Sequence, residues 1–114
     1  MPCIPEKPHT EFYDAYKQSE EWKLVCEERR RYDGYRCVCC GKPALLCREG
    51  LQVHHLTYEN LGHEDIKHDI VSMCGKCHIK FHKHDAVTMR RAYRAAGWTV
   101  NGDDTDYIGR SAAE

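Results

Sequence analysis

Two adjacent histidines, His54 and His55, lie in the segment VHHLTY (residues 53–58), between residues that favour β-strands. Successive side chains of a strand point to opposite faces, so the two imidazoles cannot serve one site from one direction. Histidine is both a common metal ligand and a general base near neutral pH. The pair therefore indicates two separate tasks, with chance as the alternative in a chain that has 8 histidines among 114 residues.

A second pair, His78 and His82, is spaced by four residues on a predicted helix, which places both side chains on one face. Two imidazoles so placed can bind one divalent ion, although this spacing alone is weak evidence for a metal site. Here the pair directly follows a cysteine motif. A strand that presents His54 towards this helix would add a third ligand, and His55 on the other face would then be available as a base.

Two C-x-x-C motifs predict a structural zinc site. Cys37 with Cys40, and Cys74 with Cys77, each offer two thiolates from a tight turn, and four thiolates complete a closed tetrahedral site. The alternative is a set of reduced core cysteines without metal. Cys39 is not assigned to the site, because two cysteines separated by a single residue are less suited to binding the same ion. The remaining cysteines are interpreted as spare thiols: Cys3, Cys26 and Cys47.

Length and composition are typical of one soluble domain. No stretch approaches the roughly 20 apolar residues that span a bilayer, and the N-terminus lacks the order of a secretory signal. We therefore expect a cytoplasmic protein without a membrane partner, in which cysteines bind metal rather than form disulfides. The net charge of −1 gives no evidence for nucleic acid, but local basic groupings such as EERRR (27–31) allow a basic surface or a solvated helix face.

The chain divides into an irregular arm at 1–15, a folded domain at 16–97 and an acidic, flexible tail at 98–114. The expected elements are, in order, a helix from an N-cap at Ser19 to Asp33, a strand entering a turn at 35–42, two short strands within 45–56, a polar loop at 57–69, and helices within 74–85 and 86–97. In the first helix, Trp22, Val25 and Cys26 are expected in the core.

Several motifs together resemble the His-Asn-His (HNH) endonuclease family. They are the Cys37-x-x-Cys40 knuckle, the His54-His55 pair, and DIVSMCGKCHIKFH (69–82). HHLTYENLGHE (54–64) is similar to a subgroup common in phage and bacterial genomes, and the likeness covers about residues 16–82. The resemblance implies an α+β class: a small, zinc-stabilised ββα-metal (HNH) nuclease fold with flanking N- and C-terminal helices.

The resemblance also implies roles for single residues. His54, His78 and His82 match metal ligands for a catalytic divalent ion (Mg²⁺, Mn²⁺, Ni²⁺ or Zn²⁺), and His55 matches the general base. The chain departs from the pattern where the family often has Asn, because Asp69 stands there. We interpret Asp69 as a functional substitute that fixes the loop and the base or joins the metal shell. Asn60, in the preceding loop, fits that place poorly.

The implied function is metal-assisted hydrolysis of phosphodiester bonds in DNA. The expected substrate is double-stranded DNA, and the expected location is the cytoplasm of a bacterial or phage-infected cell. Phosphate contacts are expected from cations that are equally explained as solvated charges: Arg36, Lys76, Lys80, Arg90, Arg91 and Arg94. The alternatives are an RNA-directed nuclease and a zinc-bound module that binds nucleic acid or protein without cleaving. Protein partners of phage or bacterial origin are left open.

The loop after the histidine pair carries further candidates. Tyr58 is expected to pack under the loop, and Glu64 to brace it by bonding to a histidine. The remaining histidines are expected at the surface: His63, His68 and His84.

Overall fold

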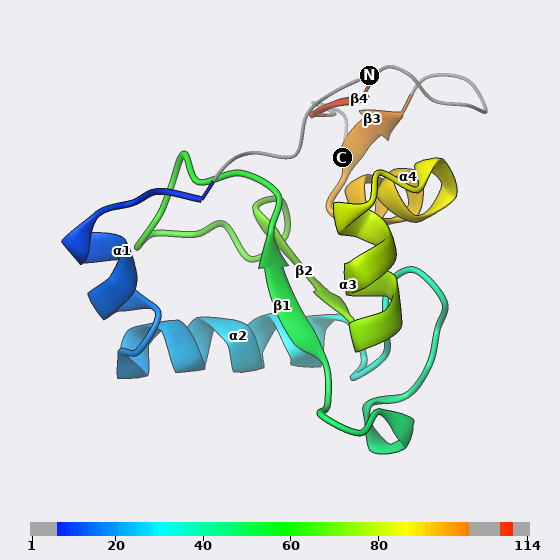
Figure 1. Cartoon of the computed structure of the whole chain (residues 1–114), viewed down its shortest axis with the longest axis horizontal. Coiled ribbons are helices and arrows are strands. Elements are labelled where there is room, and N and C mark those ends of the chain that lie inside the picture. The colour runs from blue at the N-terminus through cyan, green and yellow to red at the C-terminus, as the bar shows by residue number, and fades with distance from the viewer. Residues whose placement is uncertain (1–6, 101–107, 111–114) are drawn as a thin grey trace.

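The computed structural model describes residues 7–100 and 108–110, and these form a small α+β fold (Figure 1). Its elements are, in chain order, α1 (Glu11–Tyr16), α2 (Glu20–Tyr32), the 3-10 helix η1 (Ala44–Leu46), β1 (Gln52–His55), β2 (Ile70–Met73), α3 (Gly75–His82), α4 (Ala86–Ala95), β3 (Trp98–Val100) and β4 (Ile108–Arg110). Two antiparallel pairs are present, β1 with β2 and β3 with β4. Within the described ranges, no helix combines the length and the apolar character needed to cross a membrane.

The β1–β2 pair lies between two helices and separates two cores. α2 packs against both strands, as does α3, and Figure 1 shows the pair at the centre of the molecule between them. The register places His54 opposite Val71 and His55 opposite Ile70. Val71 belongs to the cluster that contains Phe81 of α3, whereas Ile70 belongs to the cluster that contains Trp22 of α2. Both faces of β2 are therefore buried, and neighbouring residues of β1 face different helices.

α2 begins and ends where the sequence predicts. The Ser19 hydroxyl accepts a hydrogen bond from the Trp22 backbone N–H at 3.1 Å, and Asp33 caps the C-terminal end. Acidic residues in the first turn and arginines in the last turn suit the helix dipole. Trp22 and Cys26 are buried in the core, as expected, whereas Val25 is only half-buried and packs against it. α2 thus forms a rigid base under the sheet.

Arg29 joins α2 to the rest of the molecule. Its side chain is fully buried, and its guanidinium forms two bonds to the Asp33 carboxylate at 2.7 and 2.8 Å. The same group donates to the backbone carbonyls of Ile66 and Ala95. Asp33 in turn accepts from the Ser72 N–H of β2. The EERRR segment is therefore not a uniformly solvated face, because this arginine holds helix, strand and loop together.

The helices after β2 are capped by the residues that precede them. The Cys74 sulfur accepts the Cys77 N–H at 3.5 Å at the start of α3. The Asp85 carboxylate accepts both the N–H and the hydroxyl of Thr88 at the start of α4. Both helices were predicted, and β1, β2 and α3 follow one another in the order strand, strand, helix.

The strand predictions around the first cysteine motif were wrong. Residues 35–42 form turns with one isolated bridge, between Arg36 and Pro43, instead of a strand. Of the two strands expected within 45–56, only β1 exists, because Ala44–Leu46 is a 3-10 helix. β1 pairs instead with β2, across the loop at 56–69. The turn residues 48–50 therefore connect η1 to β1 and do not form a hairpin.

The two ends of the described chain are more ordered than expected. The arm prediction does not hold for residues 11–15, because Thr10 caps helix α1, which buries Tyr13 and Tyr16. The flexible-tail prediction fails at its start, where Trp98 begins β3 and donates from Nε1 to the His68 carbonyl at 2.8 Å. Most of the predicted tail lies outside the described residues.

Candidate metal centres and catalytic histidine

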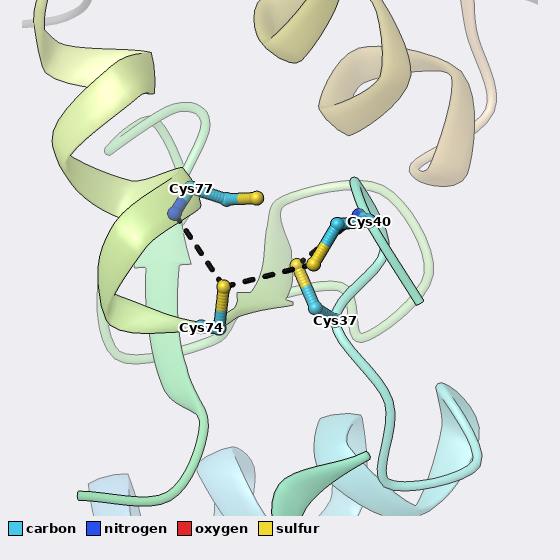
Figure 2. A group of neighbouring side chains, drawn as sticks. All are labelled: Cys37, Cys40, Cys74 and Cys77. Carbon is cyan, nitrogen blue, oxygen red and sulfur yellow. Dashed lines mark hydrogen bonds between the residues drawn. The ribbon is translucent and has the colours of Figure 1, made fainter. Parts of the chain in front are cut away.

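The four predicted zinc ligands come together at the start of α3. Figure 2 shows Cys37 and Cys40 in the loop after α2, facing Cys74 and Cys77 at the first turn of α3. Their sulfur atoms lie within 4.8 Å of one another, and the Cys40 and Cys74 sulfurs are 3.8 Å apart. Zinc–sulfur bonds of about 2.3 Å in a tetrahedron require sulfurs about 3.8 Å apart. The cluster therefore has the donors and the spacing that a structural zinc ion needs.

Backbone N–H groups support this cluster. The Cys37 sulfur accepts from the N–H groups of Cys39 and Cys40, and hydrogen bonds from the Cys39 side chain and these amides lower the pKa of Cys37 to about 3 against the effect of burial. Cys39 itself is not part of the cluster, and its sulfur lies 3.5 Å from the Thr88 carbonyl oxygen. Thiolate character at Cys37 is what a bound metal requires.

Two of the predicted phosphate-binding arginines brace the same loop. Arg36 donates to the Gly41 carbonyl at 3.0 Å, and Arg91 donates to the Cys39 carbonyl at 2.9 Å. Both side chains therefore have a structural contact next to the cysteines. Their role in binding nucleic acid stays a prediction.

The three histidines predicted to bind a catalytic ion also form one cluster. Nε2 of His78 lies 3.1 Å from Nδ1 of His54 and 3.1 Å from Nε2 of His82. Metal–nitrogen bonds of about 2.0–2.1 Å place neighbouring nitrogens about 2.9–3.4 Å apart. Burial decreases from His54 through His78 to the exposed His82. The cluster thus fits one divalent ion and is open to solvent at its His82 side.

Burial keeps His54 and His78 in the form that binds metal. Desolvation, with smaller contributions from the neighbouring His78 and His82, lowers the pKa of His54 to about 3. Burial also lowers the pKa of His78, with smaller contributions from His82 and Lys17. Both imidazoles are therefore neutral near pH 7, with lone pairs available. Nε2 of His54 is buried without a hydrogen-bond partner among the described residues, so packing against Phe81 orients this ring.

Gln52 orients the central histidine of the cluster. Its side-chain oxygen accepts a hydrogen bond from Nδ1 of His78. This bond assigns the proton of neutral His78 to Nδ1 and directs the Nε2 lone pair to the other two histidines. Gln52 is not among the residues predicted from the sequence. The available signal was strand alternation, because Gln52 lies two residues before His54 and on the same face of β1.

His55 occupies the other face of β1, as strand alternation predicts. Its ring is stacked between Trp22 and Tyr58, with ring centroids 4.7 Å from each. Nε2 bonds to the Glu64 carboxylate at 2.8 Å, and both side chains are almost completely buried. Tyr58 packs as expected, and its partner is His55 itself.

Glu64 is the carboxylate that orients His55. It also accepts the Tyr16 hydroxyl at 2.6 Å and the Gly62 N–H at 3.3 Å. Burial raises the pKa of Glu64, but the bonds from His55 and Tyr16 outweigh burial, and the net effect lowers the pKa. Glu64 is therefore ionised and can stabilise a proton on His55. The prediction that Glu64 braces the loop by bonding to a histidine is confirmed.

Asp69 organises the loop before β2. Its fully buried carboxylate accepts the Asn60 side-chain N–H and the Asp65 backbone N–H, both at 2.9 Å. Its backbone carbonyl accepts the Leu56 N–H. Asp69 and Asn60, which the sequence analysis treated as competing candidates, are thus partners. The first predicted role of Asp69 was to fix the loop and the base, and these bonds agree with its loop part alone, because the carboxylate bonded to His55 is that of Glu64. A direct part of Asp69 in catalysis stays a prediction.

A cavity of about 740 Å³ lies beside the histidines. Its lining consists of Lys7, Tyr13, Lys17, Val53, His54, His55, Tyr58, His78, His82 and His84. His54 and His55, for which two separate tasks were predicted, therefore line one cavity. None of the six predicted phosphate-binding cations lines it. The lysines that line the cavity are Lys7 and Lys17. Neither was predicted from the sequence, and Lys17 directly follows α1, a helix that was not predicted.

The remaining predicted cations lie elsewhere. Lys76 lines a cavity of about 210 Å³ with Lys42, Arg48 and Gln52. Lys80 and Arg94 are exposed, and Arg90 is half-buried. Among the remaining histidines, His63 and His84 are exposed as expected. His68 is half-buried and donates to the Ala96 carbonyl.

Comparisons with known proteins add no relatives. No family model matches the chain, and neither the curated proteins nor the solved structures give a significant match. The motifs and the side-chain geometry therefore carry the functional argument.

Proposed function

We propose that this protein is a metal-dependent HNH endonuclease that hydrolyses phosphodiester bonds in DNA. The observation that supports this proposal is the division of the adjacent histidines. His54 joins a three-histidine cluster, His55 bonds to a buried carboxylate, and both line one cavity. Such a site combines a place for a divalent ion with an oriented base, which hydrolysis of a phosphodiester requires.

Two metal ions belong to this proposal. The four-cysteine cluster would hold a structural zinc ion that fixes the start of α3. His54, His78 and His82 would hold the catalytic ion, with Gln52 orienting His78. When bound, that ion supplies Lewis-acid stabilisation of the charge that develops on the phosphate and the leaving oxygen.

His55 is the proposed general base. Its Nε2–H donates to Glu64, so Nδ1 is the nitrogen that takes the proton from the attacking water. Glu64 stabilises the imidazolium that forms, and the rings of Trp22 and Tyr58 hold the imidazole in place. A mobile imidazole would lose the orientation that makes proton transfer efficient.

A plasmid-nicking assay tests this proposal. Supercoiled DNA is incubated with wild-type protein, His55→Ala and the control His63→Ala in Mg²⁺, Mn²⁺, Ni²⁺ or Zn²⁺. We expect wild type and His63→Ala to form relaxed or linear DNA, and His55→Ala to be slower by about 10²–10⁴-fold. His63 is a fair control because it is an exposed histidine of the adjacent loop. The nuclease proposal would be refuted if all three proteins were equally active, or if none of them cleaved DNA with any of the four metals.

One observation favours the alternative, a non-catalytic zinc-bound module that binds nucleic acid or protein. The His55 side chain is only 2% exposed, which also suits a structural histidine. The same assay separates the two functions, because a binding module would retain DNA in a mobility shift while no variant cleaves it. An RNA substrate in parallel reactions tests for an RNA-directed nuclease.

A further inference from the structure

Lys17 places a cation at the histidine cavity from outside the β1–β2–α3 unit. It caps the C-terminal end of α1, and Figure 1 shows α1 and α3 on opposite sides of β1. Lys17 nevertheless lines the same cavity as His54, His55 and His78. Lys17 therefore adds a positive charge to the space on which the histidine cluster opens.

Aromatic side chains hold this ammonium in position. Nζ lies 5.1 Å from the ring centroid of Tyr13 and 5.3 Å from that of Trp22, and it donates to the Tyr13 hydroxyl at 3.2 Å. Trp22 is also the ring stacked on His55. Ring faces attract a cation without neutralising it. The position of Lys17 is therefore coupled to the ring that positions His55.

Lys17 has no carboxylate partner among residues 7–100. The ion pairs there join other residues, and Glu64, the carboxylate that orients His55, is bonded to His55 and Tyr16. By contrast, Lys23 of α2 pairs with Glu20 at 3.2 Å on the surface. A half-buried ammonium to which residues 7–100 offer no paired carboxylate, next to a cluster fit for a divalent cation, gives the cavity a positive potential that suits an anion.

We propose that Lys17 binds the phosphate group of the substrate in this cavity, beside the three-histidine cluster. The inference rests on the proposed function, which makes that anion a phosphodiester of DNA. A lysine is a point charge suited to a phosphate oxygen, and it would hold the phosphate near both the metal site and His55. The phosphate contact at the reacting centre thus comes from α1 and not from the arginines of α4.

The test measures DNA binding as a function of salt. A fluorescent duplex of about 12 base pairs is titrated with zinc-loaded protein, without other divalent ions, between about 50 and 200 mM KCl. Each phosphate contact contributes about 0.9 to the slope of log K against log salt. We expect Lys17→Met to reduce the slope by about 0.9, Lys17→Arg to retain it, and Lys23→Met to match the wild type. Methionine keeps the apolar stem between Tyr13 and Trp22, so the fold is retained.

The outcomes separate this inference from the proposed function. If Lys17→Met retains both the wild-type slope and the wild-type cleavage rate, the inference is overturned and the nuclease proposal stands. If the wild type never cleaves DNA but Lys17→Met still loses slope, the phosphate contact stands and the nuclease proposal fails. If the wild type does not bind the duplex, both are overturned. Thermal melting of each variant shows whether a loss comes from unfolding, and in that case Lys17→Gln replaces Lys17→Met.

Discussion

The imidazole of His54 is buried, and the metal binding proposed for it needs its neutral form. Burial alone makes the charged form costly, and two neighbouring histidines add to that cost. A divalent ion benefits from the same arrangement, because it competes with protons for the nitrogen lone pairs. The same energetic effect that prepares the cluster for metal therefore makes the unliganded cluster sensitive to acid.

This sensitivity predicts how stability depends on pH. In the unfolded chain His54 has a pKa of about 6.5, whereas in the folded protein the pKa is lowered to about 3. Between pH 6.5 and pH 3, His54 is protonated in the unfolded state but not in the folded state. The free energy of unfolding therefore falls as the pH decreases from about 6.5 towards 3. We expect a loss of about 3 kcal/mol between pH 7 and pH 4 from this residue. Urea denaturation at several pH values measures it.

The matched control is His54→Gln, which keeps a polar side chain but cannot take up the proton. Both proteins retain the four-cysteine cluster, so its own response to acid is common to the two. We expect the variant to lose less stability over this pH range. If the free energy of unfolding depends on pH in the same way in both proteins, the buried imidazole of His54 is not the cause of the acid sensitivity.

A substitution at Glu64 tests the contribution of the carboxylate that orients His55, while His55 itself is unchanged. Glu64→Gln keeps the shape of the side chain but removes the charge that stabilises a protonated His55. We expect nuclease activity to fall by about 10–100-fold with unchanged metal affinity of the three-histidine cluster, since carboxylates of this kind act through the residue they orient. Plasmid nicking and Co²⁺ titration measure the two quantities.

Glu59→Gln is the control for this variant, because Glu59 is an exposed carboxylate of the same loop. A Glu64→Gln protein as active as Glu59→Gln would mean that His55 needs no carboxylate. A loss of metal affinity equal to the loss of rate would mean that Glu64 acts on the cluster instead.

At the scale of elements, short-range patterns predicted what depends on neighbours in the chain. Strand alternation separated His54 from His55, and the Ser19 cap with the arginines of the last turn delimited α2. The C-x-x-C spacing predicted the cysteine cluster because each pair is formed within one turn. The spacing of four residues placed His78 and His82 together for the same reason.

Features that depend on distant contacts were missed. β1 pairs with β2 across a loop whose path is determined by Asp69 and Asn60, and no local pattern predicts that bond. α1 has only six residues, so its helix depends on packing of Tyr13 and Tyr16 rather than on propensity. The position of Lys17 beside Tyr13 follows from that packing.

Arg29 offers a test of how the elements are joined. Arg29→Met keeps an unbranched apolar stem but leaves the Asp33 carboxylate and the carbonyls of Ile66 and Ala95 without their donor. Removing one partner of a buried ion pair costs about 3–5 kcal/mol. We expect a loss of this size in the free energy of unfolding, measured by urea denaturation. Arg31→Met is the control, because Arg31 is exposed on the same helix, and equal losses for both variants would contradict the assignment.

At the scale of the whole molecule, the residues that the structure describes form two small cores, one on each face of the β1–β2 pair. The larger core includes Cys37, Cys74 and Cys77 among its buried residues, so the candidate zinc site is part of the core. A chain of this length buries a modest apolar surface, and a structural metal adds folding free energy directly. The cysteine cluster also connects the loop after α2 to the first turn of α3, which carries His78.

Removal of zinc should therefore unfold more than the metal site. A bound structural zinc contributes on the order of 10 kcal/mol in favourable cases. We expect that a strong chelator, or Cys37→Ser combined with Cys74→Ser, lowers the melting temperature sharply and abolishes the binding of the first zinc per chain, as measured by circular dichroism and metal analysis. Cys47→Ser is the control, because this half-buried thiol donates to the Pro43 carbonyl and lies outside the cluster. A stable double variant that retains one tightly bound zinc would show that other residues hold the ion. The three histidines would then be the first candidates, because they form the second cluster with metal-binding geometry among the described residues.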